Sequence, residues 1–74
     1  MQSVTTEKFR ECYKKLPKPI KEQTRIAYSL WRQSPYHPSL HFKLIHQNQA
    51  IYSVRIGLKW RALGIKKEDT LIWF

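Results

Sequence analysis

The chain is poor in cysteine, glycine and acidic residues. Of its 74 residues, one is cysteine, two are glycine and five are acidic, against 14 lysines and arginines. The single cysteine, Cys12, cannot form an intrachain disulfide, which excludes a disulfide-stapled secreted domain. No segment approaches the ~20 apolar residues of a membrane span, and the start MQSVTTEKFR has no apolar signal-peptide region. We therefore expect a cytoplasmic protein that does not associate with a membrane.

The residues that are abundant indicate one small basic domain. The apolar content of 42%, with three Trp, four Tyr and three Phe, is enough for one modest core within residues 1–74. The formal charge of +9 favours a polyanionic partner: a nucleic acid, an acidic protein or an anionic surface. The alternative is a basic surface that only keeps the protein soluble.

The first half of the chain predicts two helices. In residues 4–16, apolar side chains recur at i, i+3, i+4 and i+7, which is one helical face, and Thr5 or Thr6 is a suitable N-cap. Residues 19–33 predict a second helix, which opens on a proline as helices favour. Because the link between them is short, we expect an antiparallel helical hairpin.

The second half predicts strands. The segments HFKLIH, AIYSVRI, KWRALGI and TLIWF are short, rich in β-branched and aromatic residues, and separated by polar or glycine-containing turns. The expected fold class is therefore α+β: an N-terminal antiparallel helical hairpin packed on one face of a three- to four-stranded antiparallel β-sheet.

The hairpin YSVRIGLKWRALG, residues 52–64, has a predictable register. A two-residue turn at Gly57 and Leu58 would mix apolar and charged side chains on one face. A three-residue turn that adds Lys59 keeps one face apolar and sets Arg55 opposite Arg61 on the other. We prefer the second register because it separates the two faces.

The two arginines suggest a phosphate-binding site. Like charges placed opposite each other destabilise a sheet, so a structural role alone does not account for Arg55 facing Arg61. Arginine matches phosphate oxygens bidentately, and the pair could clamp one phosphate. Lys59 at the turn and Lys43 on the neighbouring strand would extend this nucleic-acid-binding patch. The alternative is that both arginines only extend into solvent.

Three histidines, His37, His41 and His46, follow the spacing H-x3-H-x4-H. No cysteine or carboxylate accompanies them, and zinc sites have tighter ligand patterns, so we expect no metal and no cofactor. Histidine suits general acid–base chemistry at neutral pH. His46, near the start of the sheet, is the preferred acid or base, and a loop or surface role is the alternative for all three.

The order FRECYKKLPKPIKEQ…LWRQSPYHPSLHFKLIH…YSVRIGLKWRALG resembles the RelE/ParE superfamily of bacterial toxins from type II toxin–antitoxin pairs. The resemblance implies a helical hairpin on a curved antiparallel sheet, in agreement with the fold expected above. RelE-like members cleave mRNA in the ribosomal A site without a metal. ParE-like members poison DNA gyrase and lack the nuclease residues. A cognate antitoxin holds both types inactive.

Residue by residue, the resemblance gives Arg55 and Arg61 the catalytic role of holding the scissile phosphate. Ser53 stands where the RelE pattern has another lysine. Family members often open with a strand and end with a segment that supplies Tyr or His and a further basic residue. Here residues 2–4 precede the first predicted helix and the sequence stops at Phe74, so the resemblance implies a domain shortened at both ends. An incomplete last strand would leave an exposed edge for an antitoxin or for a homodimer.

Two functions follow from the resemblance. One is a translation inhibitor that cleaves mRNA on the ribosome without metal, with antitoxin, ribosome and mRNA as partners. The other is a non-catalytic, ParE-like or degenerate member that binds gyrase, an antitoxin or nucleic acid. The sequence leaves open whether the chain is an enzyme, and it does not identify the target or the oligomeric state.

Overall fold

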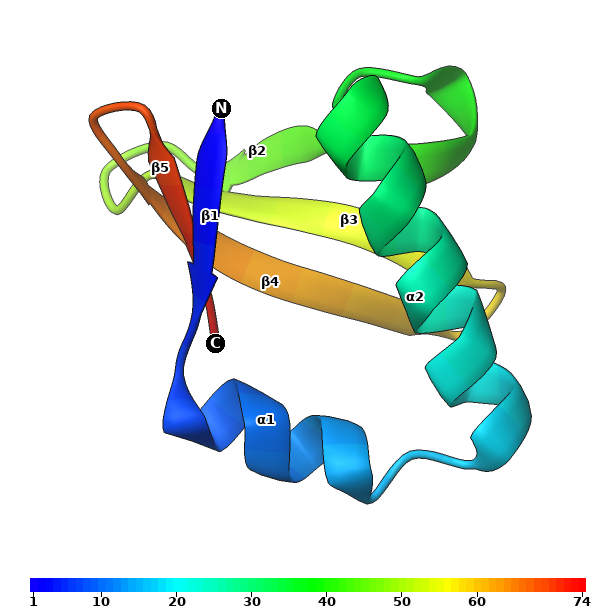
Figure 1. Cartoon of the computed structure of the whole chain (residues 1–74). Helices are drawn as coiled ribbons and strands as arrows, with labels where there is room; N and C mark the ends of the chain where they lie inside the picture. Colours follow the sequence, from blue (N-terminus) through cyan, green and yellow to red (C-terminus); the bar gives the residue numbers. More distant parts are fainter.

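The fold is a five-stranded sheet with two helices, described by a computed structural model over all residues 1–74. The elements in chain order are β1 Gln2–Thr5, α1 Glu7–Lys14, α2 Lys18–Gln33, the 3-10 turn η1 Pro38–Leu40, β2 Lys43–His46, β3 Ile51–Gly57, β4 Trp60–Lys67 and β5 Thr70–Trp73. The strand order is β1-β5-β4-β3-β2 (Figure 1). The α+β class is confirmed, but the sheet has five strands and is mixed, because β1 runs parallel to β5.

The N-terminal strand corrects two predictions. The first helix begins at Glu7 rather than residue 4. The N-terminal strand, expected to be nearly absent, is present as β1 and pairs with β5 from Gln2 to Thr5. Two of its four residues, Val4 and Thr5, are β-branched, which suits a strand. Of the two expected caps, Thr6 is the one used: its Oγ1 accepts a hydrogen bond from the Phe9 amide at 3.1 Å.

The last strand is not a free edge, which corrects the expectation of an exposed apolar edge at β5. It lies between β1 and β4, so the two edges of the sheet are β1 and β2. Thr6 secures this corner, because its Oγ1 donates to the Trp73 carbonyl at 3.0 Å and its amide reaches the same oxygen at 3.2 Å.

The two helices make unequal contacts. After the link at residues 15–17, α2 turns away from α1, so their axes diverge rather than lie side by side as an antiparallel hairpin (Figure 1). Helix α2 buries Ala27 and Trp31 against the sheet, whereas α1 buries no residue fully. Neither helix is both long and apolar enough to cross a membrane.

The core is an aromatic cluster between α2 and the sheet. Its fully buried hydrophobic members are Ala27, Trp31, Leu40, Phe42, Val54, Leu71 and Trp73. Trp31, 1% exposed, meets the Trp73 ring edge-on at 5.3 Å and the Phe42 ring at 5.8 Å. Such edge-to-face contacts contribute beyond the area that they bury, so Trp31 is the residue that joins α2 to the sheet.

Gly64 on β4 is required by the packing of β5. A Cβ atom there would lie 3.0 Å from Leu71 Cγ and 3.2 Å from Trp73 Cε3, both in the core. We expect Gly64→Ala to lower the free energy of unfolding by about 1–3 kcal/mol through overpacking, measured by urea denaturation. Lys67→Ala on the same strand, which is exposed, is the control and should change it by less than about 0.5 kcal/mol. Equal unfolding midpoints for the two variants would contradict this packing.

Candidate functional site

Arg55 and Arg61 lie directly opposite each other on β3 and β4, as the sequence predicts. The loop differs from the prediction. Gly57 pairs with Trp60, so the loop has only Leu58 and Lys59, and a register shift between Arg55 and Gly57 takes up the extra residue. A two-residue loop with one bulged residue therefore gives the same register beyond the bulge as the expected three-residue turn.

The arginine pair lies on the sheet face away from the helices. Side chains alternate along a strand, and Val54 and Ala62, the next pair along, face the core and the helices. Arg55 and Arg61 thus project from the other face, where Arg55 is half-buried and Arg61 exposed. The acidic turn residues Glu68 and Asp69 follow the far end of β4, about 20 Å along the strand from Arg61. The arginine pair therefore forms an open, positively charged patch.

His41 adds a third member to the row formed by these two arginines. Lys43 pairs with Ser53, and continuing this antiparallel register by two residues sets His41 opposite Arg55. Arg55 Nη1 lies 3.4 Å from His41 Nε2, at the long end of the hydrogen-bond range. A guanidinium only donates, so a hydrogen bond between these two atoms needs the His41 tautomer in which Nε2 is the acceptor. We call His41, Arg55 and Arg61 the cross-strand row.

The backbone at His41 is strained in a way that often marks functional sites. His41 ends η1 in the left-handed region, with φ of 47°. Non-glycine residues adopt this conformation infrequently, and the strain persists only where the surrounding structure enforces it. The strained turn directs the chain from η1 into β2 and places the imidazole beside Arg55.

The other predicted residues lie at different distances from the cross-strand row. Lys43, opposite Ser53, is one row away on the same face, and Lys59 is in the exposed loop two residues before Arg61. His46 follows a register shift in β2 and pairs with Ile51. Ile51 is four residues from Arg55, or about 13 Å along β3. The structure thus brings both lysines near the arginines and does not bring His46 there.

The sequence alone favours His46 among the three histidines, although the register of β2 also indicates that His41 lies beside Arg55. Once Lys43 is paired with Ser53, counting two residues back on β2 and two forward on β3 gives His41 opposite Arg55. The pairing of β2 was not predicted, and the proline-rich segment before it gave no reason to continue a strand register through His41.

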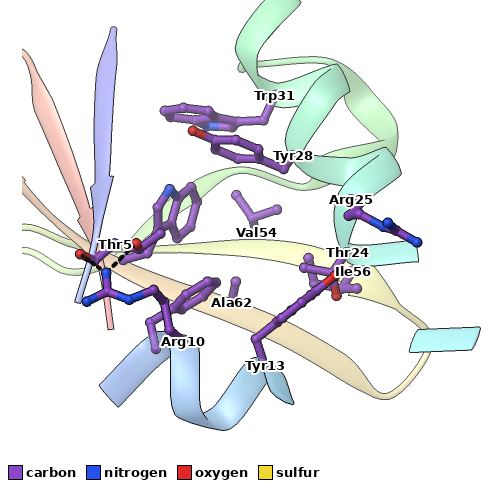
Figure 2. A pocket seen from close by; sticks show the side chains of 12 residues that line it. Thr5, Arg10, Tyr13, Thr24, Arg25, Tyr28, Trp31, Val54, Ile56 and Ala62 are labelled. Atoms are coloured by element: carbon purple, nitrogen blue, oxygen red, sulfur yellow. Dashed lines mark hydrogen bonds between the residues drawn. The ribbon is translucent and has the colours of Figure 1, made fainter. Parts of the chain in front are cut away.

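A separate cavity lies on the helix side of the sheet, between α1, α2 and the core (Figure 2). Its volume is about 230 Å³, and most of the residues that line it are apolar. At its β1 corner, Arg10 Nη1 donates to the Thr5 carbonyl at 3.0 Å and to Thr5 Oγ1 at 2.9 Å. No group of three or more His, Cys, Asp or Glu side chains converges here or elsewhere to form a metal site. The cavity is apolar and contains no group of side chains arranged for catalysis.

The sequence and the fold both have known relatives. A family model described as the ParE-like toxin domain matches residues 18–74. The chain belongs to the ParE-like toxin family. The resemblance to the RelE/ParE superfamily of type II toxins is thereby confirmed.

The fold of this ParE-like toxin is also found in a solved toxin–antitoxin complex. A chain in the crystal structure of the heterotetrameric YoeB–YefM toxin–antitoxin complex from Staphylococcus aureus superposes with a TM-score of 0.65. The match covers 99% of this chain and 90% of that chain at 15% sequence identity, so it supports the shared fold. No curated protein sequence matches this chain.

Proposed function

We propose that this ParE-like toxin inhibits translation by cleaving mRNA on the ribosome. The observation that supports this most directly is the cross-strand row on an open face of the sheet. It combines two fixed positive charges with one imidazole, which lies beside Arg55. Phosphodiester cleavage requires this combination of charge stabilisation and proton transfer.

The proposed reaction uses the RNA's own 2′-hydroxyl. When Arg55 turns to the phosphate, His41 Nε2 is released from its contact with that arginine and takes the proton of the 2′-hydroxyl, whose oxygen attacks the adjacent phosphorus. The bond from phosphorus to the 5′ oxygen breaks, and that oxygen takes a proton from water, which leaves a 2′,3′-cyclic phosphate and a 5′-hydroxyl. Arg55 and Arg61 bind the non-bridging oxygens and stabilise the charge that develops on them. Lys43 and Lys59 bind flanking phosphates, and no metal takes part in these steps.

This assignment gives the two histidines different roles. We expect His41→Asn to lower the cleavage rate by about 10²-fold or more, which is the usual contribution of a general base. Asparagine tolerates the left-handed backbone of residue 41, so the fold should be retained. His46→Asn is the matched control, and its rate on mRNA-programmed ribosomes should stay close to wild type. A larger loss in His46→Asn than in His41→Asn would return the proton-transfer role to His46.

We further propose an antitoxin as the protein partner. The chain of the same fold in the Staphylococcus aureus complex is assembled with the YefM antitoxin. In this chain all four residues of edge strand β2 are exposed, and the formal charge of +9 favours an acidic partner. Homodimer formation through β1 or β2 is the other arrangement that free edges allow.

A gyrase inhibitor is the second candidate function. The matching family model is described as ParE-like, and Ser53, where the RelE pattern has lysine, is buried with its hydroxyl unpartnered. The two functions separate soon after induction of the gene in growing cells. The translation proposal predicts that amino-acid incorporation falls first, while plasmid supercoiling is unchanged. Loss of supercoiling before any loss of protein synthesis would contradict it and favour gyrase.

A further inference from the structure

The outer face of α2 carries a basic stripe that the cross-strand row does not use. Its members, spaced three, four and seven residues apart and therefore on one side of the helix, are Lys18, Lys21, Arg25 and Arg32. The side chains of Ala27 and Trp31 point the opposite way into the core. The only acidic residue of α2 is Glu22, in the N-terminal half of the helix. After Glu22, the only charged residues of α2 are Arg25 and Arg32.

A shallow hollow lies on α2 around these two arginines. It is lined by Arg25, Tyr28, Ser29, Arg32 and Gln33. Two guanidiniums, a hydroxyl and an amide supply hydrogen-bond donors, and no carboxylate is present. Arg25 also lines the apolar cavity on the other side, at its α2 wall (Figure 2). The hollow thus offers donors of the kind that bind phosphate.

Tyr28 holds one side of the hollow in place. Its hydroxyl is 2.7 Å from Ser3 Oγ on β1, and its ring stacks on the buried Trp31 at 6.2 Å. The Arg32 guanidinium lies 6.0 Å from the centre of the Tyr28 ring, within the range of a cation–π contact. Arg32 is therefore partly ordered before any ligand binds, which lowers the entropic cost of binding.

We infer that the outer face of α2 binds the phosphate backbone of duplex RNA. Arg25 and Arg32 are seven residues apart, or about 10.5 Å along the helix. At this spacing the two arginines are able to contact separate phosphates of a polymer, as the backbone of a duplex presents them. Ser29 and Gln33 lie between and beside them and are able to hydrogen-bond a 2′-hydroxyl, the group that distinguishes RNA from DNA.

This surface and the cross-strand row face opposite ways. Helix α2 packs on the face opposite to Arg55 and Arg61, and the thinnest dimension of the molecule is 20 Å. One RNA strand at the arginine pair does not also cover α2. A folded RNA that encloses the toxin would contact both surfaces, and this choice of RNA rests on the proposed function at the ribosome.

The test measures the affinity of the protein for a fluorescein-labelled RNA duplex of about 16 base pairs. Binding is detected by fluorescence anisotropy at KCl concentrations between about 50 and 200 mM. We expect Arg25→Gln/Arg32→Gln to weaken binding about tenfold and to reduce the slope of log K against log salt by roughly 1.5. Lys8→Gln/Lys67→Gln removes the same charge from exposed positions outside both surfaces. Its slope should stay close to wild type.

Two outcomes would overturn the inference. If both double variants weaken binding equally, the effect is one of net charge and α2 has no specific role. If a DNA duplex of the same sequence binds as tightly as the RNA, the assignment to RNA is wrong. Because this assay requires no cleavage, loss of the α2 effect and failure of the proposed nuclease are separate results. Arg25→Lys/Arg32→Lys retains the charge and should retain the salt slope, which excludes unfolding as the cause of a loss.

Discussion

Replacing both Arg55 and Arg61 by alanine is expected to abolish growth arrest while the fold becomes slightly more stable. Removing one preorganised donor from a developing oxyanion costs about 10²–10³ in rate, and this variant removes two cations. The same change relieves the repulsion of a directly opposed like-charge pair, worth about 0.2–1 kcal/mol. Growth after induction and urea denaturation of the purified protein measure the two effects.

This combination distinguishes a functional pair from a structural one. Lys8→Ala/Lys67→Ala removes two exposed charges away from the cross-strand row and should leave growth arrest intact. A double arginine variant that still arrests growth would contradict the assigned role. A variant that loses both toxicity and stability would show that the arginines support the fold instead.

Trp31→Ala is expected to unfold most of the protein. Truncating a buried Trp in a packed core costs about 3–5 kcal/mol, and Trp31 contacts both Trp73 and Phe42. A domain of this size has only a few kcal/mol of net stability, because it buries about 60% of its unfolded surface. The free energy of unfolding, measured by urea denaturation with near-ultraviolet circular dichroism, should fall close to zero.

Ile26→Ala provides the control on the same helix. Ile26 is 68% exposed, and alanine has the higher helix propensity, so its free energy of unfolding should change by less than about 0.5 kcal/mol. If Trp31→Ala were as stable as Ile26→Ala, the aromatic cluster would not be what holds α2 on the sheet.

Much of the fold can be predicted from local patterns in the sequence. The second helix begins within one residue of its predicted start and ends where predicted, because its apolar stripe and flanking prolines are local signals. The register that places Arg55 opposite Arg61 was predictable because only that register separates apolar from charged faces.

The N-terminal strand cannot be predicted from local patterns. Thr5 pairs with Trp73, at the other end of the chain, and no local sequence pattern predicts a parallel partner strand so far away. Residues 4–6 are compatible with either a helix start or a strand, and the pairing with β5 decides between them. Tertiary contact thus overrides local propensity at this end of the chain.

Only the part of the candidate site that depends on local structure can be predicted from the sequence. Arg55 and Arg61 meet because of a hairpin, which is a local structure. His41 reaches Arg55 through the 3-10 turn at Pro38–Leu40 and a left-handed residue that redirects the chain, neither of which the residue pattern specified. His46 was preferred because it lay near the sheet, but the register shift within β2 leaves it opposite Ile51.

The most direct test of the central claim is cleavage of an mRNA on purified, programmed ribosomes, with the new ends mapped by primer extension and their termini analysed chemically. We expect cuts that require the ribosome, that carry a 2′,3′-cyclic phosphate and a 5′-hydroxyl, and that are lost in Arg55→Ala/Arg61→Ala. Intact mRNA in the presence of folded wild-type toxin would contradict it, and the cross-strand row would then be a binding surface without nuclease activity.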